Sequence, residues 1–182
     1  SDIKAMSAHN YQKYVAFCDV DLERTLRVKE ISPDTPIYQD FREMLTEKGD
    51  EIDAVTVSTP DHMHAYCSIM AMKMGKHVYC QKPLTHNVWE ARQVAKVAKD
   101  VGVITRMGNQ IHSHQFYRTA VELIQSGRIG KVKRVDSWSG ATGHGKSGHI
   151  SRPKSEDPVP DSLDWDSWIG VAPMRPYSAA ER

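Results

Sequence analysis

The chain has 182 residues, of which 40% are hydrophobic and 26% charged, an ordinary globular composition with enough length for one sizeable core. A formal net charge of +1 excludes the basic surface that gathers nucleic acid or anionic membrane, and no apolar run reaches the roughly 20 residues of a membrane span. Cys18, Cys67 and Cys80 are odd in number and contain no CxxC pair, which argues against a disulfide framework and against a zinc knuckle.

The hydrophobic pattern over residues 14–107 alternates between short strands and amphipathic helices. We predict strands over 15–18, 36–38, 54–58, 77–80 and 103–107, and helices over 1–13, 22–31, 41–48, 65–74 and 88–101. Asp21, Asp40 and Asn87 stand where a side-chain oxygen can cap the following helix, and Gly75 suits a left-handed helix end. This order of elements with short connections indicates an α/β fold built on a doubly wound parallel sheet.

The pattern changes after Gly108. Beyond it we predict a helix over 116–124, a strand over 132–138 and at most a short helix over 165–169. Gly, Ser, Pro and His dominate the rest of the chain. We therefore expect residues 1–108 to form one domain and residues 109–182 to begin a second.

Polar residues follow two of the predicted strands at the points where the strands end. In a parallel sheet ligands bind at the carboxyl ends of strands, so we expect 59–64 and 81–83 to lie side by side at one cleft. Pro83 would give Lys82 a set direction, and a lysine in a partly dry cleft can exchange a proton with a hydroxyl. The alternative is a solvated surface charge. Asp19, at another strand end, either caps its turn or binds the two hydroxyls of an adenosine ribose.

One stretch, residues 140–147, fits the pattern of a phosphate-binding P-loop. That loop needs a helix directly after it, because the phosphate rests on the free amide groups of the helix. Prolines at positions 153, 158 and 160 prevent such a helix. The stretch is therefore predicted to be a flexible glycine-rich loop.

Two histidine pairs could in principle supply a metal with imidazole ligands, His62 with His64 and His112 with His114. Asp61 is the only carboxylate near either pair at ligand spacing. We therefore predict no metal site and interpret His64 as a polar contact to a ligand.

Taken together, the polar strand ends resemble those of the glucose-fructose oxidoreductase / inositol dehydrogenase family, Gfo/Idh/MocA. The matching pieces are the strand end 17–21, the loop 59–64, the strand 76–83 and the strand end 108–110. The resemblance implies a Rossmann-type domain that binds a nicotinamide dinucleotide, followed by the start of an α+β domain that holds a sugar or polyol. It also implies a homo-oligomer. The compartment stays open between cytoplasm and periplasm.

By the same resemblance, Lys82 is the catalytic residue for proton transfer, and its bond to Pro83 is often cis. Gln81 departs from the family pattern, which usually has Glu at this position. The residues implied in cofactor binding are Asp19, Ser58, Thr59, Pro60, His62, His64, Gln81, Lys82, Pro83 and Asn109. Those implied near the substrate are His114, Trp165 and Trp168, of which the tryptophans either stack on a sugar or pack in a core.

The function implied is hydride transfer between a sugar, polyol or sugar derivative and the dinucleotide. NAD is favoured over NADP, since the carboxylate of Asp19 would repel a 2′-phosphate. Three alternatives stay open: a redox-neutral, NAD-dependent glycosidase of the same family, a metal-dependent sugar isomerase or lyase that uses the histidine pairs, and a non-catalytic sugar-binding protein.

The resemblance also predicts that these residues are a fragment. The first strand of the family fold and its GxGxxG turn should precede Ser1, and the second catalytic group should follow Arg182. Where that central strand is missing from the sheet, we expect the strands at 15–18 and 55–57 to have unpaired ladders in the core, which is costly unless something fills the gap. We further expect weak or no cofactor binding and no turnover by these residues alone.

Overall fold

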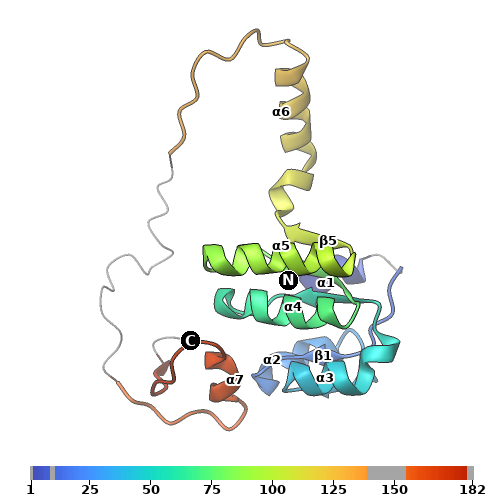
Figure 1. The fold of residues 1–182 in the computed structure, drawn as a ribbon, viewed down its shortest axis with the longest axis vertical. Coiled ribbons are helices and arrows are strands. Elements are labelled where there is room, and N and C mark those ends of the chain that lie inside the picture. Colours follow the sequence, from blue (N-terminus) through green and yellow to red (C-terminus); the bar gives the residue numbers. More distant parts are fainter. Residues whose placement is uncertain (1, 9–10, 139–154, 180–182) are drawn as a thin grey trace. The chain divides into compact units, whose positions relative to one another are not determined.

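The computed structural model describes residues 2–8, 11–138 and 155–179 (Figure 1). Two compact units can be distinguished, one made of Ser1–Gly108 with Glu156–Tyr177 and one of Asn109–Ser155 with Ser178–Arg182. The break after Gly108 falls where the sequence pattern changes. Residues 156–177 nevertheless group with the first unit, because the side chains of Leu163 and Ile169 are buried there.

The strands of the first unit are all parallel to their neighbours. They are β1 (Phe17–Cys18), β2 (Ile37–Tyr38), β3 (Ala54–Val57), β4 (His77–Gln81) and β5 (Thr105–Gly108). β1 pairs with β2, and the other three form a sheet in the order β3-β4-β5. Among the described residues no strand joins the two sheets. The parallel α/β architecture predicted from the sequence is confirmed.

Helices connect these strands, and local sequence signals set their ends. The helices are α1 (Asp2–Ser7), α2 (Leu22–Lys29), α3 (Phe41–Lys48), α4 (His64–Lys73) and α5 (Val88–Val101). The predicted caps are confirmed, because Asp21, Asp40 and Asn87 each accept a hydrogen bond from a backbone amide in the first turn. Gly75 and Gly102 end α4 and α5 at φ +77° and +75°, the left-handed conformation that glycine adopts without strain.

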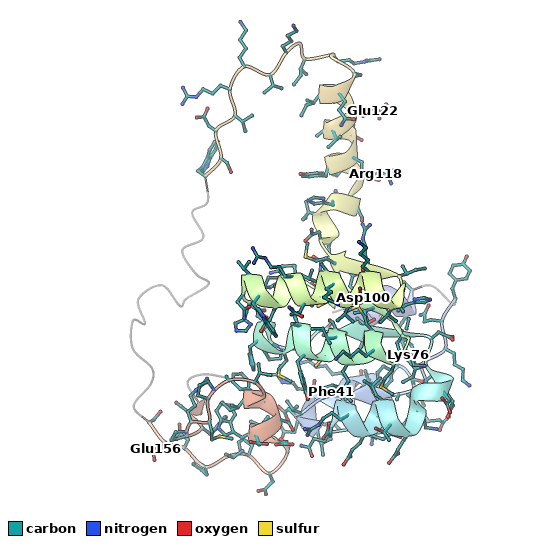
Figure 2. All side chains as sticks on the ribbon, viewed as in Figure 1. Phe41, Lys76, Asp100, Arg118, Glu122 and Glu156 are labelled. Carbon is teal, nitrogen blue, oxygen red and sulfur yellow. The ribbon has the colours of Figure 1, made fainter. Side chains whose placement is uncertain are left out.

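The core lies between the sheet and two helices. α4 and α5 run side by side along one face of β3, β4 and β5 (Figure 1). Val57, Val78 and Cys80 point from the strands into this core and meet buried side chains of the helices. Phe41, at the junction of α3 and α4 (Figure 2), packs edge to face on Tyr66 with ring centroids 5.7 Å apart. Each such apolar side chain, when buried, stabilises the fold by about 1.5 to 3 kcal/mol.

The second unit is described mainly by helical elements. They are a 3₁₀ turn over Gln110–Ser113 and α6 (Gln115–Gln125), on which Figure 2 marks Arg118 and Glu122. The strand predicted over 132–138 is wrong, since residues 131–138 have no regular structure and Val132, Val135 and Trp138 are exposed. A strand needs a partner to satisfy its backbone groups, and none of the described residues pairs with this segment.

Several predicted elements are also shorter than expected. The first helix ends at Ser7, β1 comprises two residues, and β5 begins at Thr105. The short helix expected over 165–169 is present as α7 (Trp165–Ile169). Among the described residues, no helix combines the length and the apolar character that crossing a bilayer requires.

Candidate functional site

The carboxyl ends of β3, β4 and β5 lie at one edge of the sheet. The register places Val57 beside Cys80, and Gln81 beside Gly108. The loop that begins at Ser58 and the loop that begins at Lys82 therefore leave the sheet as neighbours. This is the position predicted for the site from the order of elements.

His64 ties these two loops together. Its ring is buried, with 1% of its surface exposed. Nε2 lies 2.8 Å from the carbonyl oxygen of Thr59, and Nδ1 lies 2.5 Å from the carbonyl oxygen of Pro83. Both partners can only accept, so the ring donates to both when both nitrogens carry a proton. The predicted contact of His64 with a ligand stays a prediction. In the structure, both ring nitrogens contact backbone carbonyl oxygens.

Lys82 is the candidate catalytic residue, and its backbone is held from both sides. The Lys82–Pro83 bond is cis, as the resemblance predicted. The amide of Lys82 donates to Oε1 of Gln81 over 3.0 Å, and the carbonyl of Pro83 accepts from His64. The side chain of Lys82 is exposed. The partly dry cleft expected around Lys82 is not formed by the described residues.

Gly108 completes this part of the site and was missed as a site residue in the sequence. A Cβ atom added there would lie 2.9 Å from Oε1 of Gln81 and 3.0 Å from the hydroxyl oxygen of Tyr79. The absence of a side chain at Gly108 therefore lets Gln81 lie across β5 and accept from the amide of Lys82. The sequence alone shows a glycine at a strand end, but only the strand register shows that Gln81 lies beside it.

Asp19 stands at the carboxyl end of β1, as predicted, and is half-buried. Burial raises the pKa of its carboxyl, while a hydrogen bond from the Asp21 amide and the charge of Arg24 oppose that rise. Its Oδ1 accepts from the backbone N of Asp21 over 3.0 Å. This bond is the turn-capping role that the sequence offered for Asp19. Because a carboxylate has two oxygens, the capping role does not exclude a ribose contact.

His62 and the two tryptophans meet in the first unit. Nε2 of His62 donates to the carbonyl oxygen of Trp168 over 2.9 Å. Trp165 and Trp168 stack with ring centroids 4.8 Å apart, and the Arg175 guanidinium lies 5.6 and 5.8 Å from the two rings. In the structure the two tryptophan rings therefore pack on each other and beside Arg175, which is the packing alternative considered for them. Their contact with a substrate stays a prediction.

The remaining predicted site residues belong to the second unit. Asn109 precedes the 3₁₀ turn, and its carbonyl accepts from the amide of His112. Nδ1 of His114 accepts from the amide of Phe116 over 3.4 Å and so caps α6. The roles predicted for Asn109 and His114 stay predictions.

The geometry does not support the hypothesis that the two histidine pairs bind a metal ion. His62 and His64 bond to backbone carbonyl groups, and His112 stacks on Tyr117 at 5.3 Å. In the part of the chain that the structure describes, no three side chains of His, Cys, Asp or Glu are arranged to hold a metal ion. The glycine-rich stretch 140–147 lies outside the described residues.

Parallel strands linked by helices, with polar loops gathered at their carboxyl ends, define a Rossmann-type fold. Residues 1–109 match the sequence model of the Gfo/Idh/MocA family, an oxidoreductase family with an NAD-binding Rossmann fold. The chain belongs to this family.

Relatives agree with this assignment. The chain is 27% identical over 150 residues to myo-inositol 2-dehydrogenase of Thermotoga maritima, which covers 82% of this chain and 40% of the relative. The crystal structure of myo-inositol 2-dehydrogenase from Lactobacillus plantarum is similar at TM-score 0.65 and 28% identity, over 72% of this chain and 39% of the other. A 3-ketoreductase from Actinomadura kijaniata, solved with TDP-benzene and NADP, is similar at TM-score 0.62 and 26% identity, over 71% and 40%. The chain thus spans at most 40% of the length of these relatives.

Proposed function

We propose that the whole protein is an NAD(P)-dependent oxidoreductase that acts on a sugar, a polyol or a sugar derivative. The observation that carries this proposal is the fixed position of Lys82 at the carboxyl end of β4, in a chain of an NAD-binding oxidoreductase family. The names of the relatives support the substrate class, since two are inositol dehydrogenases and one is a ketoreductase.

The residues present fit a dinucleotide. A half-buried carboxylate, Asp19, ends β1, and exposed Ser58, Thr59 and Pro60 end β3. These groups would hold the cofactor, with Asp19 on the adenosine ribose. When bound, the nicotinamide would accept a hydride from a carbinol carbon or supply one to the corresponding carbonyl carbon.

Lys82 handles the proton in this reaction. Its Nζ accepts the hydroxyl proton when the substrate is oxidised and returns it when a ketone is reduced. His64, Gln81 and Pro83 hold the backbone of Lys82, so these contacts set the point from which its side chain leaves the loop.

The cofactor that we propose is NAD rather than NADP. The carboxylate of Asp19 accepts hydrogen bonds from ribose hydroxyls and repels a 2′-phosphate. The similar ketoreductase was solved in complex with NADP, so the two cofactors need a direct comparison.

Net formation of NADH from NAD and a panel of inositols and aldoses tests the proposal in the whole protein. We expect the absorbance of NADH to increase with one class of these substrates. Release of an aglycone without net NADH would identify the redox-neutral glycosidase instead. Turnover that a chelator abolishes and that needs no dinucleotide would contradict the proposal.

A further inference from the structure

Residues 162–170, which we call the strap, return to the first unit from far along the chain and dock beside the end of β1. The amide of Leu22 donates to the carbonyl of Ser162 over 2.9 Å, and the amide of Asp164 donates to the carbonyl of Val20 over 2.9 Å. The hydroxyl of Ser162 donates to Oδ1 of Asp21, also over 2.9 Å. These bonds hold the strap on the residues that directly follow Asp19.

A second anchor holds the other end of the strap on the loop after β3. Nε2 of His62 donates to the carbonyl of Trp168, and the two rings lie 5.5 Å apart. Gly170 is so close to Met63 that an added Cβ atom would lie 2.1 Å from its Sδ. His62 and Met63 are the second and third residues after Pro60, so this anchor sits on the predicted cofactor loop.

The strap is bonded and packed as part of the first unit. Nε2 of Gln39, at the end of β2, donates to the carbonyls of Val20 and Ser162 over 2.9 and 3.1 Å. Leu163 is 8% exposed and Ile169 is 1% exposed. The strap therefore has one defined position, held by polar bonds along its length and by two buried apolar side chains.

β1 and β3 share no backbone ladder among the described residues, whereas the strap is bonded to the loops that follow both of them. We propose that the strap sets the position of the Asp19 loop relative to the Thr59-Pro60 loop and thereby the affinity for the dinucleotide. Ser162 and His62 are then positioning residues, which act on the cofactor through the loops they hold. This inference rests on the proposed function, since it assigns the two loops to one dinucleotide.

Gly170→Ala tests the strap, and Gly102→Ala is its matched control. Gly170 has φ +55° and no room for a Cβ atom, so alanine displaces the strap from Met63. Gly102 also has a positive φ, +75°, but no atom lies within 4 Å of its added Cβ, so alanine there causes backbone strain without a clash. Circular dichroism confirms that each variant is folded.

Two readouts are compared in the purified whole protein. Hydrogen exchange at the amides of Leu22 and Asp164 reports docking of the strap, because each amide donates a hydrogen bond between the strap and the residues after β1. Titration with NADH, followed by its fluorescence, reports affinity. We expect Gly170→Ala to speed exchange at both amides and to weaken NADH binding about tenfold or more, with kcat at saturating cofactor unchanged. Gly102→Ala should leave both readouts within about twofold.

Ser162 provides a second variant pair that does not depend on backbone strain. Ser162→Ala removes the donor to Oδ1 of Asp21 and should raise KM for the dinucleotide without lowering kcat. Ser162→Thr should restore KM in large part, because its hydroxyl can donate to the same oxygen. If Gly170→Ala does not fold, this pair decides the question.

Faster exchange with unchanged NADH affinity would overturn the strap proposal and leave the proposed function standing. Weaker affinity without faster exchange would also overturn it, because the loss would not pass through the strap. Wild-type whole protein that binds neither NADH nor NADPH would refute the proposed function and the strap proposal together.

Discussion

His64 and Pro83 are joined by a 2.5 Å contact between Nδ1 of the buried ring and the carbonyl oxygen of the proline. Pro83 follows the candidate catalytic residue, and the other nitrogen of the ring bonds to Thr59. The first residue of α4 therefore holds both loops of the candidate site.

Removing this ring should destabilise the fold. His64→Ala removes the buried ring that bridges the carbonyl groups of Thr59 and Pro83 and opens a cavity, so we expect the free energy of unfolding to fall by about 2 to 4 kcal/mol. Urea unfolding followed by circular dichroism measures the change. His77→Ala, at an exposed histidine, is the control and should cost much less. Equal losses for the two variants would mean that His64 does not hold the loops.

Lys82→Met should lower kcat by about 100-fold or more in the whole protein, because a positioned proton-transfer group contributes a factor of that size. The dissociation constant of NADH should stay nearly unchanged, since the fold and the backbone of the loop are kept. Lys73→Met, at an exposed lysine of α4, is the matched control and should keep full activity. Unchanged turnover in Lys82→Met would refute the catalytic role.

Gly108→Ala should disturb Lys82 through Gln81. The added Cβ would lie 2.9 Å from Oε1 of Gln81, the atom that accepts from the amide of Lys82. We expect a loss of stability of about 1 kcal/mol and a lower kcat. In a double-mutant cycle, the loss caused by Gly108→Ala should shrink when Gln81→Ala is already present. Strict additivity of the two changes would show that Gln81 does not transmit the effect.

Asp19→Ala should narrow the preference for NAD over NADP. Alanine removes both the acceptor for the ribose hydroxyls and the repulsion of a 2′-phosphate, so KM should rise for NAD and fall for NADP. The ratio of kcat/KM for the two cofactors measures the effect. Asp34→Ala, at an exposed carboxylate, controls for the loss of one negative charge. A ratio that does not move would place the ribose away from Asp19.

The cysteines should react slowly in the folded protein. Burial raises the pKa of Cys18 and of Cys67 from 9.0 to about 12, so the thiolate fraction at pH 8 falls by about a thousandfold. Iodoacetamide labelling, followed by mass spectrometry, should be slow in the native protein and fast in urea. Fast native labelling of Cys67 would show that its surroundings open readily.

The same pKa shifts predict how stability depends on pH. The unfolded chain releases these thiol protons near pH 9, whereas the folded chain keeps them to about pH 12. The stabilisation that the two thiols contribute is therefore fully present below pH 9 and is lost as the pH rises toward 12. Serine substitutions at both positions should flatten this part of the stability profile in urea unfolding experiments.

Local features of the structure could be predicted from the sequence. The caps at Asp21, Asp40 and Asn87 and the left-handed turn at Gly75 depend on residues a few positions apart, so the pattern contains all the information they need. The parallel order and the meeting of the loops after β3 and β4 follow from the alternation of strands and helices. These signals were enough to locate the candidate site.

Contacts between distant residues could not be predicted in this way. The strand expected over 132–138 has the right composition but no pairing partner among the described residues, and the strap packs with residues that lie more than 50 positions earlier in the chain. The bridge from His64 to Pro83 and the space that Gly108 leaves for Gln81 depend on register and rotamer. Sequence alone determined the helices, the parallel strands of the first unit and the place where their polar ends gather, because helix caps and hydrophobic periodicity act locally. Only tertiary structure decided which side chains hold those ends in place, because each such contact joins residues that packing brings together.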